Sequence, residues 1–115
     1  MAAAPFRIQT IPDLAGRFQV LRLSGALTIS SVHELQETVR SSKCLCVILD
    51  FTAVPYLDSA GLGSLVGAYI AAQKIGRKLA FVGVNEKVKA LMEMTHVAHL
   101  FPQFATVSEA EAKLL

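Results

Sequence analysis

The residues best placed to do chemistry are Asp58 and Ser59, which stand where an extended segment gives way to a predicted helix. Pro55 disfavours helical backbone at Val54, and Asp and Ser are both favoured at helix N-caps. The fourteen positions after Ser59 carry neither a charge nor a proline. A hydroxyl there would lie beside unpaired backbone N–H groups and the positive end of the helix dipole. Such a place can hold an anion, including a phosphoryl group on the serine itself. The alternative is that both residues merely cap a core helix.

The other nucleophiles and bases form no catalytic or metal-binding pattern. Ser59 lacks the Gly-x-Ser-x-Gly turn of hydrolases, and Ser64 falls inside the predicted helix. His96 and His99 are three residues apart, with no evident third metal ligand. The sequence gives no reason to place any histidine, His33 included, beside Ser59. We therefore predict a protein that is not an enzyme and holds no metal.

Neither the glycines nor the cysteines predict a cofactor or a cross-link. The G-x-G-x-x-x-G spacing over 61–67 departs from the dinucleotide fingerprint, and no Walker lysine follows it. Cys44 and Cys46 are two apart in an apolar run, which predicts buried thiols on one face of a strand. A disulfide between two such residues is geometrically poor.

The composition indicates one domain of 115 residues, long enough to bury a core. Hydrophobic residues make up 53% and charged residues 17%, so we expect some exposed apolar surface for a partner or a weak homodimer. A net charge of +2 with scattered basic residues argues against nucleic-acid binding. The longest uncharged run, 59–73, is shorter than the roughly 20 residues that span a bilayer. Segment 1–5 has no signal-peptide pattern, so we expect a cytoplasmic protein without an integral membrane segment.

The first half of the chain predicts two strands, a helix and a third strand. Apolar residues alternate over 6–11 and 18–23, and the turn formers over 12–16 predict an antiparallel hairpin. Ser31 and Glu34 fit a capping box that opens a helix running to about Ser41. Residues 44–49 are apolar throughout, which is typical of a strand buried on both faces. Asp50 is then expected at the carboxyl end of that strand.

The second half predicts a helix over 59–75 ended by Gly76, a strand over 78–84 and a helix capped by Asn85. A short strand over 105–107 and a last helix with a capping box at 108–111 follow. The helical spacing predicts core positions Leu62, Leu65, Val66, Tyr69 and Ile70 in one helix, and Val88, Leu91, Met92 and Thr95 in the next, with Met94 also filling the core. Glycine inside a helix costs up to about 1 kcal/mol relative to alanine. The three in 59–75 therefore indicate that a neighbouring backbone or a partner comes close.

The run YLDSAGLGSLV over 56–66 resembles the signature of STAS domains of the anti-sigma factor antagonist type. Three further stretches fit the same family in order, over 21–27, over 47–51, and over 79–84 continuing into 88–92. Together they cover about 6–112 of the chain. The resemblance implies a single α/β STAS domain over 1–115, with a mixed sheet of four to five strands and about four helices.

The resemblance also implies a site and its partners. Ser59 matches the serine that a partner kinase phosphorylates, and Asp58 would shape the site and orient that serine. The small residues Ala60, Gly61 and Gly63 would let a partner approach closely. The implied partners are an anti-sigma factor with serine kinase activity, bound when Ser59 is unphosphorylated, and a phosphatase that restores binding. Thr28 is expected on the same partner-binding surface, together with the Ser64 hydroxyl.

One departure from the family pattern keeps a second hypothesis open. Many antagonists carry acidic residues where this chain has Ala26 and Thr28, so part of an anionic partner surface is missing. The alternative is a STAS subunit that docks on the ATPase of a membrane lipid ABC transporter without being phosphorylated. In that case Asp58 and Ser59 would serve mainly as a helix cap and contact surface.

Overall fold

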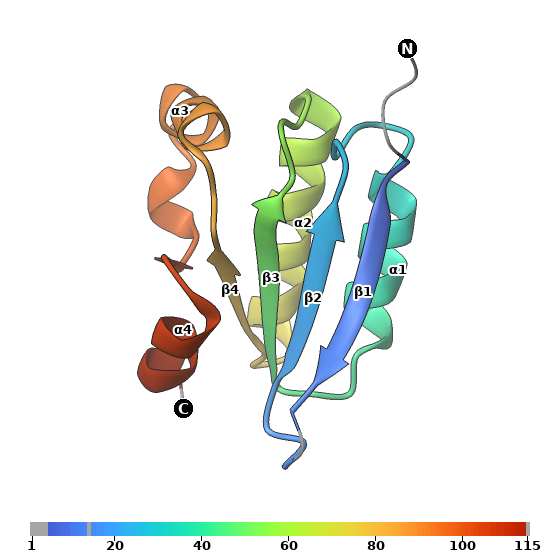
Figure 1. Ribbon diagram of the computed structural model, residues 1–115, viewed down its shortest axis with the longest axis vertical. Coiled ribbons are helices and arrows are strands. Elements are labelled where there is room, and N and C mark those ends of the chain that lie inside the picture. The colour runs from blue at the N-terminus through green and yellow to red at the C-terminus, as the bar shows by residue number, and fades with distance from the viewer. Residues whose placement is uncertain (1–4, 14, 115) are drawn as a thin grey trace.

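After an initial pair of strands, strands and helices alternate along the chain, and the strands join in sequence order into one sheet (Figure 1). The computed structural model describes residues 5–13 and 15–114. Its elements are β1 (Arg7–Pro12), β2 (Gln19–Ser24), α1 (Val32–Ser41), β3 (Cys46–Ala53), α2 (Ser59–Lys74), β4 (Lys78–Val82), α3 (Glu86–Met94), the 3₁₀ helix η1 (Ala98–Leu100), β5 (Gln103–Phe104) and α4 (Val107–Leu114). The strand order is β1-β2-β3-β4-β5, with β1 antiparallel to β2 and the other pairs parallel. The predicted α/β fold with a mixed sheet is confirmed.

The alternation of side chains along β2 divides the core into two layers. Leu21 and Leu23 join the larger cluster, which the sheet forms with α1, α2 and α3. Phe18 and Val20 join the smaller cluster on the other face, beneath α4. In the view of Figure 1, α1 and α2 lie behind the sheet.

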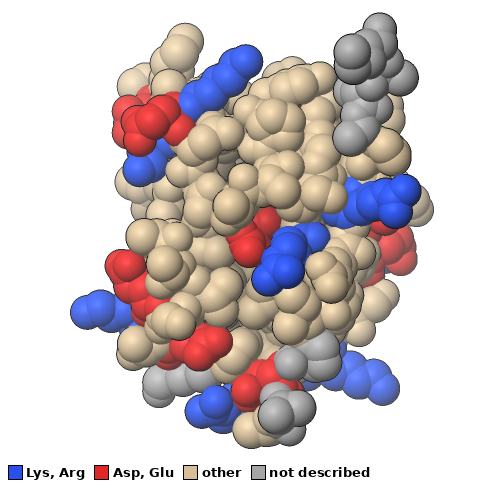
Figure 2. Space-filling model, in the orientation of Figure 1, with Lys and Arg blue, Asp and Glu red and all other residues tan. Residues whose placement is uncertain are grey.

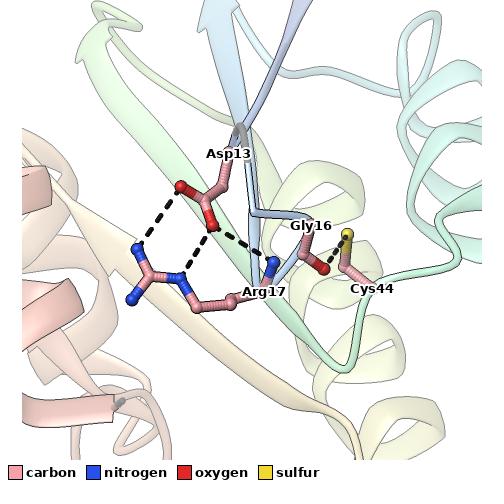
Figure 3. A network of polar contacts seen from close by, with 4 residues as sticks. All are labelled: Asp13, Gly16, Arg17 and Cys44. Carbon is pink, nitrogen blue, oxygen red and sulfur yellow. Dashed lines mark hydrogen bonds and ion pairs between the residues drawn. The ribbon is translucent and has the colours of Figure 1, made fainter.

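The β1–β2 turn is closed by a local ion pair (Figure 3). The Asp13 carboxylate accepts hydrogen bonds from the backbone N–H of Arg17 at 3.2 Å and from the Arg17 Nε at 2.9 Å. Hydrogen bonding from the Arg17 guanidinium lowers the pKa of the Asp13 carboxyl below its ordinary value. Gly16 adopts a φ of +70° in this turn. Leu14 of the predicted turn lies outside the described residues, as do residues 1–4 of the N-terminal segment.

The two cysteines do not share a strand face. β3 begins at Cys46, so Cys44 lies before the strand. Cys44 is half-buried, and its thiol donates to the carbonyl oxygen of Gly16 at 3.8 Å (Figure 3). Cys46 is buried, and burial raises the pKa of its thiol. The prediction of a buried thiol is therefore confirmed for Cys46 and wrong for Cys44.

Two predicted capping boxes are wrong in detail. Ser31 stands at the N-cap of α1, but its backbone is already helical and its hydroxyl donates to the Ala26 carbonyl oxygen at 3.2 Å instead of capping the helix. An N-cap side chain needs extended backbone to reach the first-turn N–H groups. At α4, the hydroxyl oxygen of Thr106 accepts from the backbone N–H of Glu109 at 3.1 Å. The overlapping Thr-x-x-Glu pattern thus replaces the one predicted at Ser108.

Two predicted positions along the sheet are also shifted. β3 continues to Ala53, so Asp50 lies inside the strand and not at its end. Its carboxylate stays buried in the sheet because it accepts from the backbone N–H of Thr52 at 2.9 Å and from the Thr52 hydroxyl at 2.6 Å. The last strand occupies Gln103–Phe104, earlier than the predicted 105–107.

The buried faces of α2 and α3 are narrower than the spacing of apolar residues in the sequence predicted. Ile70 on α2 and Met94 on α3 are both exposed. α2 instead buries small residues, Ser64, Ala68 and Ala72, beside Leu62 and Leu65. A helix whose residues are apolar or small all round gives the 3.6-residue pattern little contrast, which explains the error at Ile70.

The predicted C-terminal end of α2 and the predicted N-cap of α3 are confirmed. Gly76 follows α2 with a φ of +71°, and His96 follows α3 with a φ of +59°. Asn85 caps α3, because its Oδ1 accepts from the backbone N–H of Val88 at 2.8 Å. Among the described helices, none combines the length and apolar character needed to cross a membrane.

Candidate functional site

Asp58 caps α2 and also ties that helix to a second loop. Its Oδ1 accepts from the backbone N–H of Gly61 at 2.7 Å, as expected of an N-cap carboxylate. Its Oδ2 accepts from the backbone N–H of Ile29, at 3.2 Å, in the loop between β2 and α1. Both carboxylate oxygens are therefore engaged in holding backbone in place.

Ser59 is the first residue of α2, directly after this cap, and it is exposed. Within residues 5–13 and 15–114 no hydrogen bond engages its hydroxyl. The position lies at the positive end of the α2 dipole, where free N–H groups favour a negative charge. The hydroxyl is thus accessible, and a phosphoryl group on it would be electrostatically tolerated by the helix.

The β2–α1 and β3–α2 loops run side by side at the edge where the parallel strands end (Figure 1). Leu27 and Leu57 form an isolated parallel bridge between them. The Leu27 N–H donates to the Tyr56 carbonyl oxygen at 3.2 Å, and the Asp58 N–H donates to the Leu27 carbonyl oxygen at 3.2 Å. These bonds hold Thr28, which is half-buried, beside the start of α2.

The glycines of α2 have different surroundings. A Cβ at Gly61 would lie 2.2 Å from the carbonyl oxygen of Leu27, so only glycine lets the helix approach this loop. Gly63 and Gly67 are exposed, and a Cβ on either would meet nothing within 4 Å. The predicted close approach of a backbone is confirmed at Gly61, where the neighbour is part of the same chain.

Of the remaining predicted site residues, Ala60 is half-buried next to Ser59 on α2. Ser64 is buried, and its hydroxyl donates to the Gly61 carbonyl oxygen at 2.6 Å. The expectation that Ser64 adds a hydroxyl to the surface is therefore wrong. A serine hydroxyl inside a helix can donate its hydrogen bond to a backbone carbonyl oxygen of the preceding turn.

A sequence model of the STAS domain family matches residues 7–110 of this chain. The chain belongs to the STAS domain family. Two proteins of similar sequence are named as anti-sigma factor antagonists. The anti-sigma F factor antagonist of Paenibacillus polymyxa is 29% identical over 87 residues, which cover 72% of this chain and 74% of that protein. The anti-sigma-B factor antagonist of Staphylococcus aureus is 29% identical over 87 residues, covering 73% and 81%.

Solved structures of low sequence identity share the STAS fold. An anti-sigma factor antagonist from Mycobacterium paratuberculosis aligns with a TM-score of 0.79 at 21% identity, covering 97% of each chain. Unphosphorylated SpoIIAA aligns with a TM-score of 0.74 at 17% identity, covering 96% of each chain. A sulfate transporter family protein from Wolinella succinogenes aligns with a TM-score of 0.77 at 18% identity, covering 90% of this chain and 89% of that one.

Asn85 is a residue of this STAS domain whose second role the sequence did not reveal. Besides capping α3, its Nδ2 donates to the carbonyl oxygens of Val54 at 3.1 Å and Pro55 at 3.2 Å. It therefore fixes the segment that leads into Asp58. The sequence predicted that Asn85 caps a helix. It did not predict the acceptors of the Asn85 amide, because they lie about 30 residues earlier in the chain.

The loops next to Ser59 carry exposed apolar side chains. Figure 2 shows few charged side chains over the upper middle of the molecule, where the two loops end. Tyr56 and Ile29 are exposed apolar side chains of these loops. The Lys87 ammonium lies 5.7 Å from the centre of the Tyr56 ring, beside a hollow of about 320 Å³ between the β3–α2 loop and α3. Among the described residues, no group of three or more His, Cys, Asp or Glu side chains is placed to hold a metal.

Proposed function

We propose that this STAS domain is an anti-sigma factor antagonist that switches partners according to the phosphorylation of Ser59. The observation that carries the proposal is the Ser59 hydroxyl, which is exposed at the first residue of α2 behind a cap that Asp58 holds rigid. The anti-sigma factor antagonists among its relatives suggest the class of partner. In this role the protein acts in the cytoplasm and is not itself an enzyme. The chemistry belongs to an anti-sigma factor with serine kinase activity and to a phosphatase.

The unphosphorylated domain docks through the surface around Ser59. Gly63 lies one turn further along α2 and is exposed, with nothing within 4 Å of where a Cβ would be. Ala60 beside Ser59 is also small. A partner can therefore bring its own backbone close to α2 here, and the kinase site of the anti-sigma factor can reach the hydroxyl.

The β2–α1 loop forms the second side of the proposed docking surface. Asp58 positions this loop through its bond to the Ile29 N–H, which supports a role for the preceding residue, Thr28, at the edge of the proposed surface. Gly61 supports the surface without facing the partner, because its lack of a side chain lets α2 pack against Leu27. In this proposal Asp58 and Gly61 act by positioning the surface, while Ser59, Thr28 and Gly63 face the partner.

Phosphorylation changes the charge of the surface and leaves the fold in place. The kinase transfers the γ-phosphoryl group of ATP to the Ser59 Oγ, the hydroxyl proton passes to a base of the kinase, and ADP leaves. The new group carries about −1.5 to −2 charges, which the N-terminus of α2 tolerates. A neutral contact surface becomes anionic and strongly hydrated, so the anti-sigma factor dissociates. The phosphatase hydrolyses the phosphoserine to serine and inorganic phosphate.

The kinase step is tested with the purified domain, ATP and each serine-kinase anti-sigma factor of the same genome. Intact-mass spectrometry is expected to find one phosphoryl group on the wild-type chain, and peptide mapping is expected to place it on Ser59. Ser59→Ala should remain unmodified, whereas Ser108→Ala, which changes an exposed serine on α4, should be modified like the wild type. Full phosphorylation of Ser59→Ala would refute the assignment.

The binding step is tested by titration calorimetry with the same anti-sigma factor. Ser59→Asp is expected to bind at least about tenfold more weakly than the wild type, equivalent to about 1.4 kcal/mol. Circular dichroism should show the variant to be folded. An affinity equal to that of the wild type would contradict a charge-controlled switch.

A second candidate is a docking subunit for the ATPase of a membrane lipid ABC transporter. It is favoured by the neutral residues Ala26 and Thr28 and by the full engagement of the Asp58 carboxylate in backbone hydrogen bonds. On this account Ser59 is never phosphorylated. An unmodified Ser59 in the native host under all growth conditions, with co-purification of an ABC ATPase, would favour this function over the first.

A further inference from the structure

The outward face of α2 continues beyond the proposed docking surface and is unusually apolar. Between Ser59 and Gln73 the helix carries no charge, although several of these residues are exposed. A surface helix normally places charged side chains on its outer face. The C-terminal half of this face, beyond Gly67, begins about 12 Å along the helix axis from Ser59, at a rise of about 1.5 Å per residue. We consider this distal half separately because it has a groove of its own.

A groove of about 450 Å³ lies between the C-terminal halves of α1 and α2. Its floor is made of small side chains, and Val39 of α1 forms part of one wall. Gly67 and Ala71 are exposed within it. No contact within this chain requires glycine at position 67, since a Cβ there would meet nothing within 4 Å. The helix nevertheless carries glycine there, at a cost of up to about 1 kcal/mol relative to alanine.

The same groove carries a protruding side chain at its end. Ile75 lines the groove and is 62% exposed. Gly67 and Ala71 of α2 and Ile75, the C-cap residue of that helix, are spaced four residues apart, so they continue one ridge row along the helix. The row has a hole at Gly67 and a knob at Ile75, with Ala71 midway between them.

We propose that this groove is the contact surface of a weak homodimer, in which α2 packs antiparallel against α2 of a second copy. A two-fold axis through Ala71 places Ile75 of each copy over Gly67 of the other. A hole and a knob equidistant from one residue are what an isologous contact requires, because both copies present the same surface. Another protein would have to supply its own matching knob, whereas a second copy already has one.

The two arginine side chains that line the groove, Arg40 and Arg77, already have partners within the chain. The Arg77 guanidinium donates to the carbonyl oxygens of Val39, Ser42 and Cys44 at the C-terminal end of α1. Arg40 pairs with Glu37 at 3.0 Å. Two copies can therefore approach without leaving either guanidinium group without a hydrogen-bond or ion-pair partner. The net charge of +2 on each copy still opposes association, so higher salt should strengthen the dimer.

The size of the surface predicts weak association. The row from Gly67 to Ile75 is about 12 Å long, and stable complexes bury about 1,200–2,000 Å² in total. We expect sedimentation equilibrium to show a mass rising from monomer towards dimer between about 10 µM and 1 mM protein. Ala71→Glu places two carboxylates at the axis and should weaken dimerisation at least about tenfold. Met94→Glu makes a similar change at an exposed apolar position of α3 and should leave dimerisation unchanged.

Cross-linking tests the position of the axis directly. Helices packed through small residues lie about 8 Å apart, so residues at the axis have Cα atoms about 4–5 Å apart, within disulfide range. In a Cys44→Ser background, Ala71→Cys should form a disulfide-linked dimer under mild oxidation. Gln73→Cys, exposed on another side of α2, should cross-link far more slowly, as should the Cys44→Ser parent.

Three results would overturn the proposal, and none of them bears on phosphorylation of Ser59. The first is a monomer at every concentration and salt level. The second is dimerisation that Ala71→Glu leaves intact. The third is equal cross-linking of Ala71→Cys and Gln73→Cys. A monomer whose affinity for an anti-sigma factor falls with Ala71→Glu would assign the groove to that partner instead.

Discussion

At the residue scale, Asp58 organises the candidate site through one carboxylate. Its two oxygens accept from the backbone N–H of Ile29 in the β2–α1 loop, 29 residues away in sequence, and from that of Gly61 in the first turn of α2, 3 residues away. A carboxylate at a helix N-cap is also favoured by the helix dipole. Asp58 therefore determines both where α2 begins and where the β2–α1 loop lies.

Asp58→Ala should lower the free energy of unfolding by about 1–2 kcal/mol, because the α2 cap is lost and the Ile29 N–H loses its acceptor. Urea denaturation followed by circular dichroism measures the change. Asp58→Asn keeps one acceptor oxygen and should lose less than Asp58→Ala. A loss for Asp58→Ala within error of zero would contradict the role assigned to this carboxylate.

Asp13 should titrate below the ordinary aspartate pKa of about 3.9, because Arg17 donates hydrogen bonds to its ionised form. The stability from this pair is therefore present above about pH 4 and lost as the pH falls through the lower pKa of the folded state. Carboxyl ¹³C NMR measures the midpoint directly. Arg17→Ala should raise it towards the ordinary value and Arg17→Lys should raise it less. A midpoint insensitive to Arg17→Ala would contradict the assigned cause.

At the element scale, the three glycines of α2 differ in whether their surroundings leave room for a side chain. Position 61 requires glycine because a Cβ there would clash with the Leu27 carbonyl oxygen, whereas Gly63 and Gly67 face open space. Asn85 gives a similar lesson for α3, since it caps that helix and also holds the strand-to-helix segment at Val54. The position of α2 thus depends on elements on both sides of it.

Gly61→Ala and Gly67→Ala should change stability in opposite directions. Gly61→Ala forces α2 away from Leu27 and should destabilise the fold by about 1–3 kcal/mol. Gly67→Ala, which meets nothing, should stabilise the helix by up to about 1 kcal/mol. Thermal and urea unfolding of the two variants compare them directly. Equal effects would show that the approach to Leu27 is not what requires glycine.

At the scale of the whole molecule, an aromatic stack crosses the larger core layer. The Phe51 and Phe81 rings lie 5.3 Å apart on β3 and β4, and Phe101 lies 4.6 Å from Phe81. Tyr69 of α2 meets Phe101 edge to face at 5.9 Å. The stack therefore joins the sheet, α2 and the segment after η1.

Phe101→Ala should lower the free energy of unfolding by about 3–5 kcal/mol, because it empties a buried aromatic position. Phe101→Leu keeps most of the volume and should lose less than half as much. Equilibrium unfolding in urea measures both variants. A loss below about 1 kcal/mol for Phe101→Ala would indicate that the segment after η1 contributes little to the core.

The sequence by itself determined the order of the elements, most of their boundaries and the cap that opens α2. These are local properties, since alternation, apolar runs and cap residues act over a few neighbouring positions. Local signals failed where two patterns overlapped, as at Thr106 and Ser108, or where a helix was apolar all round, as at Ile70. The signature over 56–66 also indicated the family before any fold was known.

Only the tertiary structure decided which side chains meet around Ser59. The Asp58–Ile29 and Asn85–Val54 bonds join residues about 30 positions apart, and no local pattern encodes such pairs. They form because β2, β3 and β4 run parallel, so the loops at their carboxyl ends come to the same edge of the sheet. The tertiary structure also decided that Gly61 serves contact within the chain while Gly63 and Gly67 face outward. That distinction depends on where Leu27 lies in space.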